Sequence, residues 1–311
     1  MLRIGLGLQV TFLCLALRRD WIYLLSSDAR ALISRDLMEA ALNAQSSLIP
    51  RLGWLVRGGG VLGLSESTAL WTVWVALLLA GCFLVIGSFS RIAAVVAWFL
   101  YLCVARSVGY FSYGVDNLTI IGLFYLMIVP LGDGWSLDSI GRHRSGNSPL
   151  VSFFRRILQI HLCLIYFFGG FSKLAGAGWW NGTSLWRALT VPPFHFVDPE
   201  FVLRWKLLLP AAGLVICGLE FLYPIFIWPR PTRNVWLIGI CMMHLSIGLT
   251  MGMFLFAFIM IVLNIAAFGP VTGSLGAVFR RREAEVLGSN DGARSDGAGF
   301  VSTDRPPAVM I

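Results

Sequence analysis

A lysine at the end of a long apolar segment is the residue of this sequence best placed to do chemistry. The segment begins after Arg155 and Arg156, and Trp180 follows Lys173 closely. From Arg155 to Lys173 it spans roughly 27 Å as a helix, close to the thickness of a bilayer core. An amine kept from water can lose its charge and act as a base or a nucleophile. The alternative is an interfacial lysine whose ammonium reaches the lipid headgroups, and the sequence leaves both interpretations open.

Further polar residues share one face of that segment. Gln159, Tyr166 and Lys173 follow one another at intervals of seven residues, so a helix places them near one face. Gly169 and Gly170 occupy the turn before the lysine, where they let a ligand or another backbone approach closely. We therefore expect Tyr166 to lie near any ligand that Lys173 contacts.

A second group of candidates surrounds the turn between the apolar segments 92–108 and 118–131. Asp116 and Asn117 open one of these segments, and Arg106 ends the segment before it. A salt bridge or a helix N-cap across this turn is one interpretation. In the other interpretation, the same groups line the mouth of a cavity that also contains Lys173.

Glu220 and His244 form a predicted intramembrane polar pair. They lie at similar depths on consecutive apolar segments, and a carboxylate and an imidazole in such surroundings tend to pair. We interpret the pair either as a structural link or as a proton relay or ligand site. The six cysteines all lie in apolar runs and none forms a CxxC motif, so no metal site is predicted.

The composition of the chain predicts an all-α fold, a polytopic transmembrane bundle of about eight helices. Of its 311 residues, 57% are hydrophobic and 13% are charged, and the mean hydropathy is +0.78. Soluble domains carry about 25% charged residues. The net charge of +8 comes from basic residues scattered at the ends of apolar runs, which favours orientation in a membrane over binding to nucleic acid.

The apolar runs also predict where the helices cross the membrane. Spans are expected at residues 3–17, 68–89, 92–108, 118–131, the segment ending at Lys173, 207–228, and twice within 234–269. Arginines in the short loops place both termini in the cytoplasm, with Lys173 and the long loop 18–67 on the outer side. Residues 1–270 are the predicted membrane domain, and 271–311 a polar, disordered cytoplasmic tail.

Several motifs resemble a known family. Residues 166–174 (YFFGGFSKL) and 180–182 (WNG) resemble the signature of the HTTM family, which is similar to the membrane domain of vitamin K-dependent gamma-carboxylase. Other matches are Asp116-Asn117 before Gly122, residues 135–138 (WSLD), the segment around His244, residues 3–7 (RIGLG) and Ser27-Asp28. The resemblance covers about residues 1–270.

The resemblance implies a reaction as well as a fold. It implies that Lys173 is the base that deprotonates a reduced quinone such as vitamin K. Oxygenation would then give a stronger base that removes a γ-proton from glutamate before CO₂ is added, a lyase-like carboxylation. By its spacing to Gly122, Asn117 stands where the carboxylase has a catalytic histidine, so the fold and a pocket are implied more directly than the reaction.

Two hypotheses of different classes follow. In the first, the chain is a multi-pass protein of the cell membrane that acts on a quinol-like or lipid substrate. Lys173 is then the base. The site is lined by Tyr166, Asp116 and Asn117, and Trp180 forms one of its walls. In the second, a non-catalytic membrane protein binds or moves a lipophilic small molecule or scaffolds a partner. The lipid bilayer is the expected partner in both, and the sequence predicts neither the substrate nor the oligomeric state.

Overall fold

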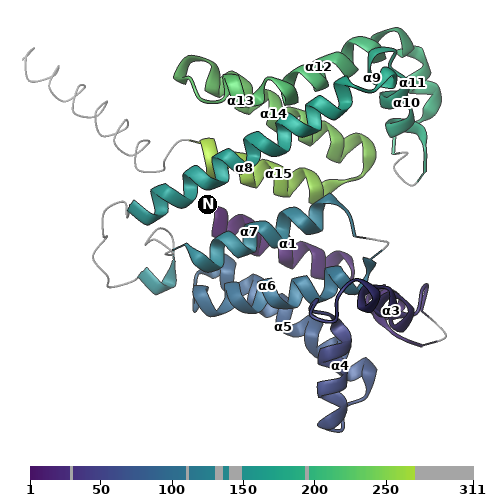
Figure 1. Ribbon diagram of the computed structural model, residues 1–311, viewed down its shortest axis with the longest axis vertical. Helices are drawn as coiled ribbons and strands as arrows, with labels where there is room; N and C mark the ends of the chain where they lie inside the picture. The colour runs from purple at the N-terminus through teal and green to yellow at the C-terminus, as the bar shows by residue number, and fades with distance from the viewer. Residues whose placement is uncertain (29–30, 110–111, 130–135, 140–148, 193–195, 270–311) are drawn as a thin grey trace, which may run out of the picture. The chain divides into compact units, whose positions relative to one another are not determined.

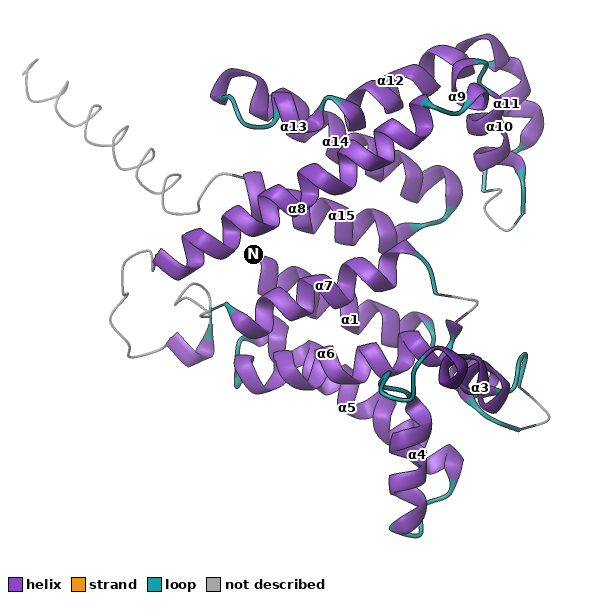
Figure 2. Cartoon of the chain, viewed as in Figure 1, coloured by secondary structure: helices purple, strands orange, loops and turns teal. Residues whose placement is uncertain are grey.

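The computed structural model describes residues 1–28, 31–109, 112–129, 136–139, 149–192 and 196–269. These residues form helices and no strand (Figure 2). Residues 1–268 make up one compact unit. The predicted disordered tail, 271–311, lies outside the described residues.

Eight predicted spans correspond to helices. These are α1 (Leu2–Ala16), α5 (Glu66–Ile86), α6 (Ser90–Ser107), α7 (Gly114–Ile128), α8 (Pro149–Leu174), α12 (Leu209–Phe221) with α13 (Tyr223–Phe226), α14 (Arg230–Met251) and α15 (Phe254–Phe268). By length and composition, α5, α6, α8 and α14 can each cross a membrane, and α1, α7 and α15 are shorter apolar helices. The predicted all-α polytopic bundle is confirmed, whereas the side of the membrane on which the termini lie stays a prediction.

The ends of these helices follow from their residue types. The Ser65 hydroxyl accepts a hydrogen bond from the Thr68 amide at 3.2 Å and caps α5. Gly252 adopts φ 71° between α14 and α15, a conformation that favours glycine. Gly248 is buried within α14 and packs against α15. Pro224 stands at the start of α13, after a break at Leu222, so the predicted span 207–228 is two helices.

The long helices form two groups within this unit (Figure 1). In the first group, α1 packs against α5 and α7, and α6 lies between α5 and α7. In the second, α8 packs against α12, α13 and α15, and α14 packs against α12 and α15. Since α15 also contacts α1 and α7, it joins the two groups. Apart from Phe254 its residues are buried or half-buried, as expected of a helix that is apolar all round.

Shorter helices and turns follow the first, fourth and fifth spans. They are α2 (Trp21–Leu25), α3 (Arg35–Gln45), α4 (Leu52–Val61), α9 (Ala177–Trp180), α10 (Thr183–Thr190), α11 (Pro199–Arg204) and the 3₁₀ turns η2 (Leu137–Ser139) and η3 (Lys206–Leu208).

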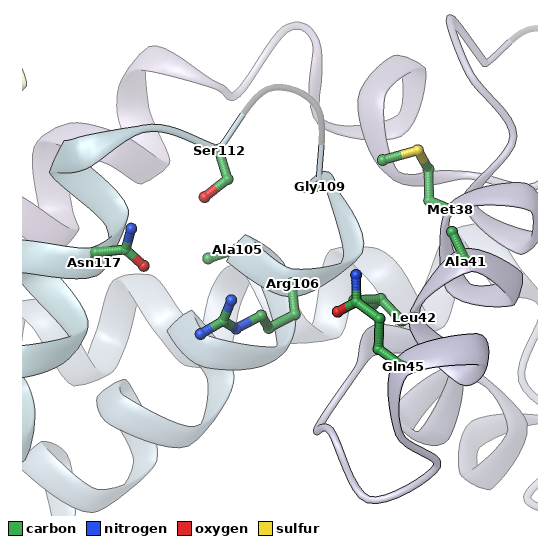
Figure 3. A pocket seen from close by; sticks show the side chains of 9 residues that line it. All are labelled: Met38, Ala41, Leu42, Gln45, Ala105, Arg106, Gly109, Ser112 and Asn117. Atoms are coloured by element: carbon green, nitrogen blue, oxygen red, sulfur yellow. The ribbon is translucent and has the colours of Figure 1, made fainter.

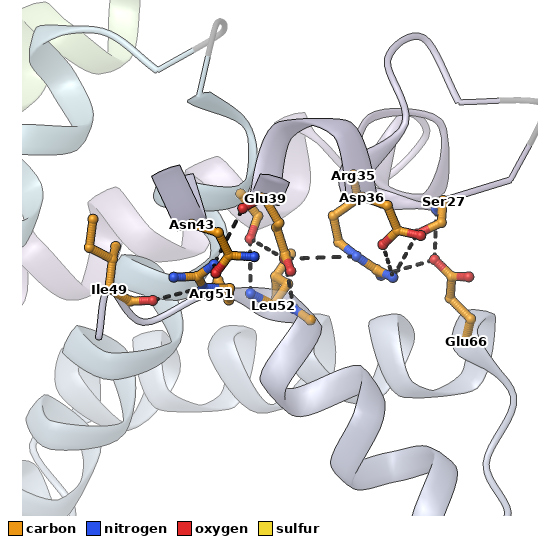
Figure 4. A network of polar contacts seen from close by, with 11 residues as sticks. Ser27, Arg35, Asp36, Glu39, Asn43, Ile49, Arg51, Leu52 and Glu66 are labelled. Atoms are coloured by element: carbon orange, nitrogen blue, oxygen red, sulfur yellow. Dashed lines mark hydrogen bonds and ion pairs between the residues drawn. The ribbon is translucent and has the colours of Figure 1, made fainter. Parts of the chain in front are cut away.

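Buried charges hold α3 in place (Figure 4). The Arg35 guanidinium pairs with Glu66 at 2.9 Å and donates to the Ser27 hydroxyl at 2.7 Å. Glu39 accepts hydrogen bonds from the Gly53 amide at 2.7 Å and the Ser107 hydroxyl at 3.0 Å. These contacts tie α3 to the beginnings of α4 and α5 and to the end of α6.

Candidate functional site

Lys173 forms an ion pair with a carboxylate of another helix. It lies in the last turn of α8, and its Nζ atom donates a hydrogen bond to Oε2 of Glu220 on α12. The Lys173 side chain is 25% exposed and that of Glu220 is 9% exposed. No carboxylate lies near Lys173 in the sequence. Glu220 is 47 residues away and reaches the lysine through the packing of α12 against α8.

The paired glycines before Lys173 explain how the two helices come so close. Gly170 lies against the backbone of Phe221, where a side chain would have no room. A Cβ atom on Gly169 would lie 3.3 Å from Glu220 Oε2 and 3.7 Å from Lys173 Nζ. The lysine side chain therefore runs back along α8, beside the preceding turn, rather than onward past the end of the helix.

The tryptophan beside the lysine is not the one expected. The Lys173 ammonium lies 5.7 Å from the centre of the Trp179 ring, within the range of a cation–π contact. Trp180 is 54% exposed, and its indole nitrogen donates to the Leu174 carbonyl at 2.7 Å. Trp180 thus closes the end of α8, and Trp179 is the aromatic neighbour of the ion pair.

A buried hydrogen-bonded cluster surrounds Tyr166. Its hydroxyl lies 2.8 Å from His244 Nε2 and accepts a hydrogen bond from Asn264 Nδ2 at 2.6 Å. The Tyr223 hydroxyl donates to Asn264 Oδ1 at 2.7 Å. All four side chains are almost fully buried. They come from α8, α13, α14 and α15, so this cluster fixes four helices around one point.

The hydrogen bond between Tyr166 and His244 is compatible with either neutral tautomer of the imidazole. The Tyr166 oxygen accepts from Asn264 and can also accept from His244 Nε2, or its own proton can be donated to that nitrogen. Among the described residues, Nδ1 has no hydrogen-bond partner, and the ring lies edge-on to Phe256 at 5.6 Å.

The structure gives Glu220 and His244 different partners from those we predicted. Both are buried on helices that pack together, as the sequence indicated. However, Glu220 binds Lys173 and His244 binds Tyr166. Our expectation of a direct pair was wrong because depth along a helix does not fix which face of that helix meets which neighbour.

Asp116 caps the helix that it opens. Its carboxylate accepts hydrogen bonds from the Tyr113 amide and the Tyr101 hydroxyl, both at 3.0 Å. The described residues contain no ion pair between Asp116 and Arg106. The first interpretation named a salt bridge or a helix cap, and of these the described residues contain the cap.

Two cavities lie beside this turn. One, of about 170 Å³, is mostly apolar, and Asp116, Tyr101, Tyr113 and Leu255 are among its lining residues. The other, of about 350 Å³, lies between α3, the end of α6 and the start of α7, and Asn117 and Arg106 line it (Figure 3). Lys173 lines neither of them, so Asp116 and Asn117 do not share these cavities with the lysine as we expected.

The sequence offered a signal for one residue that we did not select. Asn264 interrupts the apolar run of α15, and a polar residue in such a run usually has a partner or a function. Tyr223 gave no comparable signal, since tyrosines are common near helix ends in membrane proteins.

Comparison with known families identified the family of this chain. Residues 61–270 match the HTTM domain. The matched part contains Lys173 and Glu220 as well as the cluster around Tyr166. Comparisons with curated proteins and with solved structures gave no match.

Proposed function

The chain belongs to the HTTM domain family, a membrane family related to gamma-carboxylase, and we propose that it is a membrane enzyme that deprotonates a lipophilic substrate. The observation that carries this proposal is the ion pair between Lys173 and Glu220 at the edge of an apolar helix bundle. A lysine that only reaches the lipid headgroups requires no buried carboxylate partner. A lysine that acts as a base requires a group that can take its proton, and Glu220 is such a group.

The pair can accept a proton in a balanced step. Glu220 can take the proton of the Lys173 ammonium across their hydrogen bond, which leaves the lysine as a neutral amine. The amine nitrogen then takes the proton of a substrate hydroxyl group, so that an N–H bond forms, the O–H bond breaks and the electron pair remains on oxygen. The new ammonium lies next to the oxyanion and stabilises it.

The surroundings of the pair fit a flat apolar ring that carries a hydroxyl group, such as a reduced quinone. The Trp179 ring lies beside the ammonium, and Phe167 stacks on Phe221 with ring centres 5.4 Å apart. Lys173 is partly exposed and hence accessible to a molecule dissolved in the bilayer. When bound, such a ring supplies an acidic hydroxyl group, and this chain supplies the proton acceptor and an aromatic wall.

Substitution of Lys173 tests the proposal. Arginine can keep the ion pair with Glu220 but does not lose its proton, so Lys173→Arg separates a base from a structural cation. We expect Lys173→Arg and Lys173→Met to slow the oxygen-dependent consumption of a reduced naphthoquinone in nanodiscs by about 100-fold or more.

The matched control is Lys206→Met, which removes the other lysine of the chain, an exposed residue outside the site. It should leave the rate unchanged. If Lys173→Arg retains the wild-type rate, Lys173 is not the base.

A second function, binding or moving a lipophilic ligand without chemistry, is supported by the two cavities around Asp116 and Asn117. Both are at the other helix group and combine apolar walls with a few polar side chains. Mass spectrometry of molecules that co-purify with the protein distinguishes the two functions. A carrier retains the same unmodified molecule in wild type and in Lys173→Arg, and wild type converts nothing.

A further inference from the structure

We infer that the pocket between α3, α6 and α7 binds the phosphate-bearing headgroup of an anionic phospholipid. The pocket has a volume of about 350 Å³ and lies where α6 ends and α7 begins, with the amphipathic helix α3 on one side (Figure 3). This inference does not depend on the proposed deprotonation, because Lys173 does not line the pocket.

The polar side of the pocket suits a phosphate group. Arg106 contributes a guanidinium, which stays charged and matches the oxygens of a phosphate. Among the described residues the guanidinium has no hydrogen-bond or ion-pair partner, so its donors are available. Ser112 and Asn117 add neutral hydrogen-bonding groups on the side to which the Arg106 guanidinium points in Figure 3, whereas Gln45 lies with the α3 side chains.

The charges around the pocket favour an anion. Among the described residues that line it are one cation, Arg106, and no carboxylate. Asn117 belongs to the first turn of α7, where the helix dipole adds partial positive charge. Asp116, the acid of that turn, does not line the pocket; its carboxylate accepts from Tyr101 and the Tyr113 amide and is also within hydrogen-bonding reach of Ser112.

The apolar side of the pocket suits the glycerol and the first carbons of the acyl chains. Met38, Ala41 and Leu42 contribute it from one face of α3. The pocket lies at the C-terminal end of α6 and the N-terminal end of α7. Apolar spans end at the level of the headgroups, so a lipid phosphate is the anion most abundant at this depth.

The test uses the full chain, freed of lipid in detergent, and short-chain phosphatidylglycerol as the probe. We expect the probe to raise the melting temperature saturably, because a ligand that binds only the folded state stabilises it. Arg106→Gln should weaken this affinity about 10-fold or more. Arg57→Gln removes an exposed arginine from α4 and should leave the affinity unchanged.

A second variant tests the pocket independently, in case Arg106→Gln fails to fold. Ala41 is exposed, so Ala41→Trp should fold normally while its ring fills the apolar side of the pocket and blocks the probe. Inorganic phosphate and glycerol phosphate separate the possible sources of the anion. If either stabilises the protein as well as the lipid does, if phosphatidylcholine does so equally, or if both pocket variants bind like wild type, the inference is wrong.

Discussion

The ion pair between Lys173 and Glu220 limits what either residue can do alone. A carboxylate at this depth is costly without its partner, and so is an ammonium beside the apolar face of α8. The two groups should therefore respond to substitution as a unit, whether their role is catalytic or structural.

A double-mutant cycle measures this dependence. Lys173→Met leaves the buried Glu220 carboxylate unpaired, and we expect it to destabilise the protein by about 1–3 kcal/mol. Replacement of both residues by methionine should recover part of this loss, with a coupling of about 0.5–3 kcal/mol between the two sites. Thermal unfolding of the single and double variants in the same detergent gives both quantities. Strict additivity would mean that the two side chains do not interact.

Asn264 should be a second sensitive residue, because two hydroxyl groups depend on it. Asn264→Leu removes the donor to Tyr166 and the acceptor of Tyr223. Each buried hydroxyl left without its partner costs about 1–3 kcal/mol, so unfolding should become easier by roughly twice that amount. Tyr125→Phe is the control, since it removes a half-buried hydroxyl near His161 and should cost less. Equal effects of the two variants would contradict the importance of the cluster.

Two residues of the cluster, Tyr166 and His244, were visible in the sequence as polar residues in apolar runs, and so were Lys173 and Glu220. The periodicity of α8 placed Tyr166 and Lys173 on one face, and the composition marked Glu220 and His244 as intramembrane groups. Their partners were not predictable, because the choice between Lys173 and His244 for Glu220 depends on how α12 and α14 are rotated about their axes. That rotation is set by packing, above all by Gly170 against Phe221.

At the scale of elements, small residues decide how closely helices approach. Where α1 crosses α5, a Cβ atom on Gly7 would lie 2.8 Å from the Gly81 carbonyl oxygen. The Thr11 hydroxyl, one turn further on, donates to the Gly7 carbonyl at 2.9 Å and packs against Gly81. This is close helix packing of the kind that glycines allow in membranes.

Gly7→Ala should therefore separate these two helices. We expect a loss of about 1–3 kcal/mol in stability, because the added methyl group meets backbone atoms that cannot rotate away. Gly58→Ala is the matched control: Gly58 lies in α4 with open space around it, and alanine there should be neutral or stabilise by up to about 1 kcal/mol. Melting temperatures in detergent compare the two. Equal shifts would show that the close crossing is not required.

The sequence predicted the helices well and their junctions less well. Apolar length alone located the spans, and Ser65 and Gly252 marked helix ends through ordinary capping and turn chemistry. The junction between α5 and α6 is instead held by hydrogen bonds to residues that are distant in the sequence. The Asp138 carboxylate accepts from the Phe89 and Ser90 amides, both at 3.0 Å, and Arg3 donates to carbonyls at the end of α5. Contacts across so much of the chain cannot be derived from local pattern.

At the scale of the whole molecule, α15 connects two places with different chemistry. It carries Asn264 into the cluster around Tyr166, and Leu255 lines the cavity next to Asp116. It also packs against α1, α7 and α8. A ligand that displaces α15 at one place would therefore alter the packing at the other, which gives the two helix groups a physical means of acting together.

The orientation in the membrane decides from which side Lys173 is reached. Thr183 follows the end of α8 that carries Lys173, and Ser88 lies in the turn between α5 and α6 beside Arg91. If the arginine-rich turns are cytoplasmic, an impermeant maleimide should label Thr183→Cys in intact cells and Ser88→Cys only in inverted vesicles. The unsubstituted chain, with its six cysteines in apolar surroundings, gives the background. The reverse pattern would place the lysine on the cytoplasmic side, and no labelling of either variant in intact cells would argue against the cell membrane as the location.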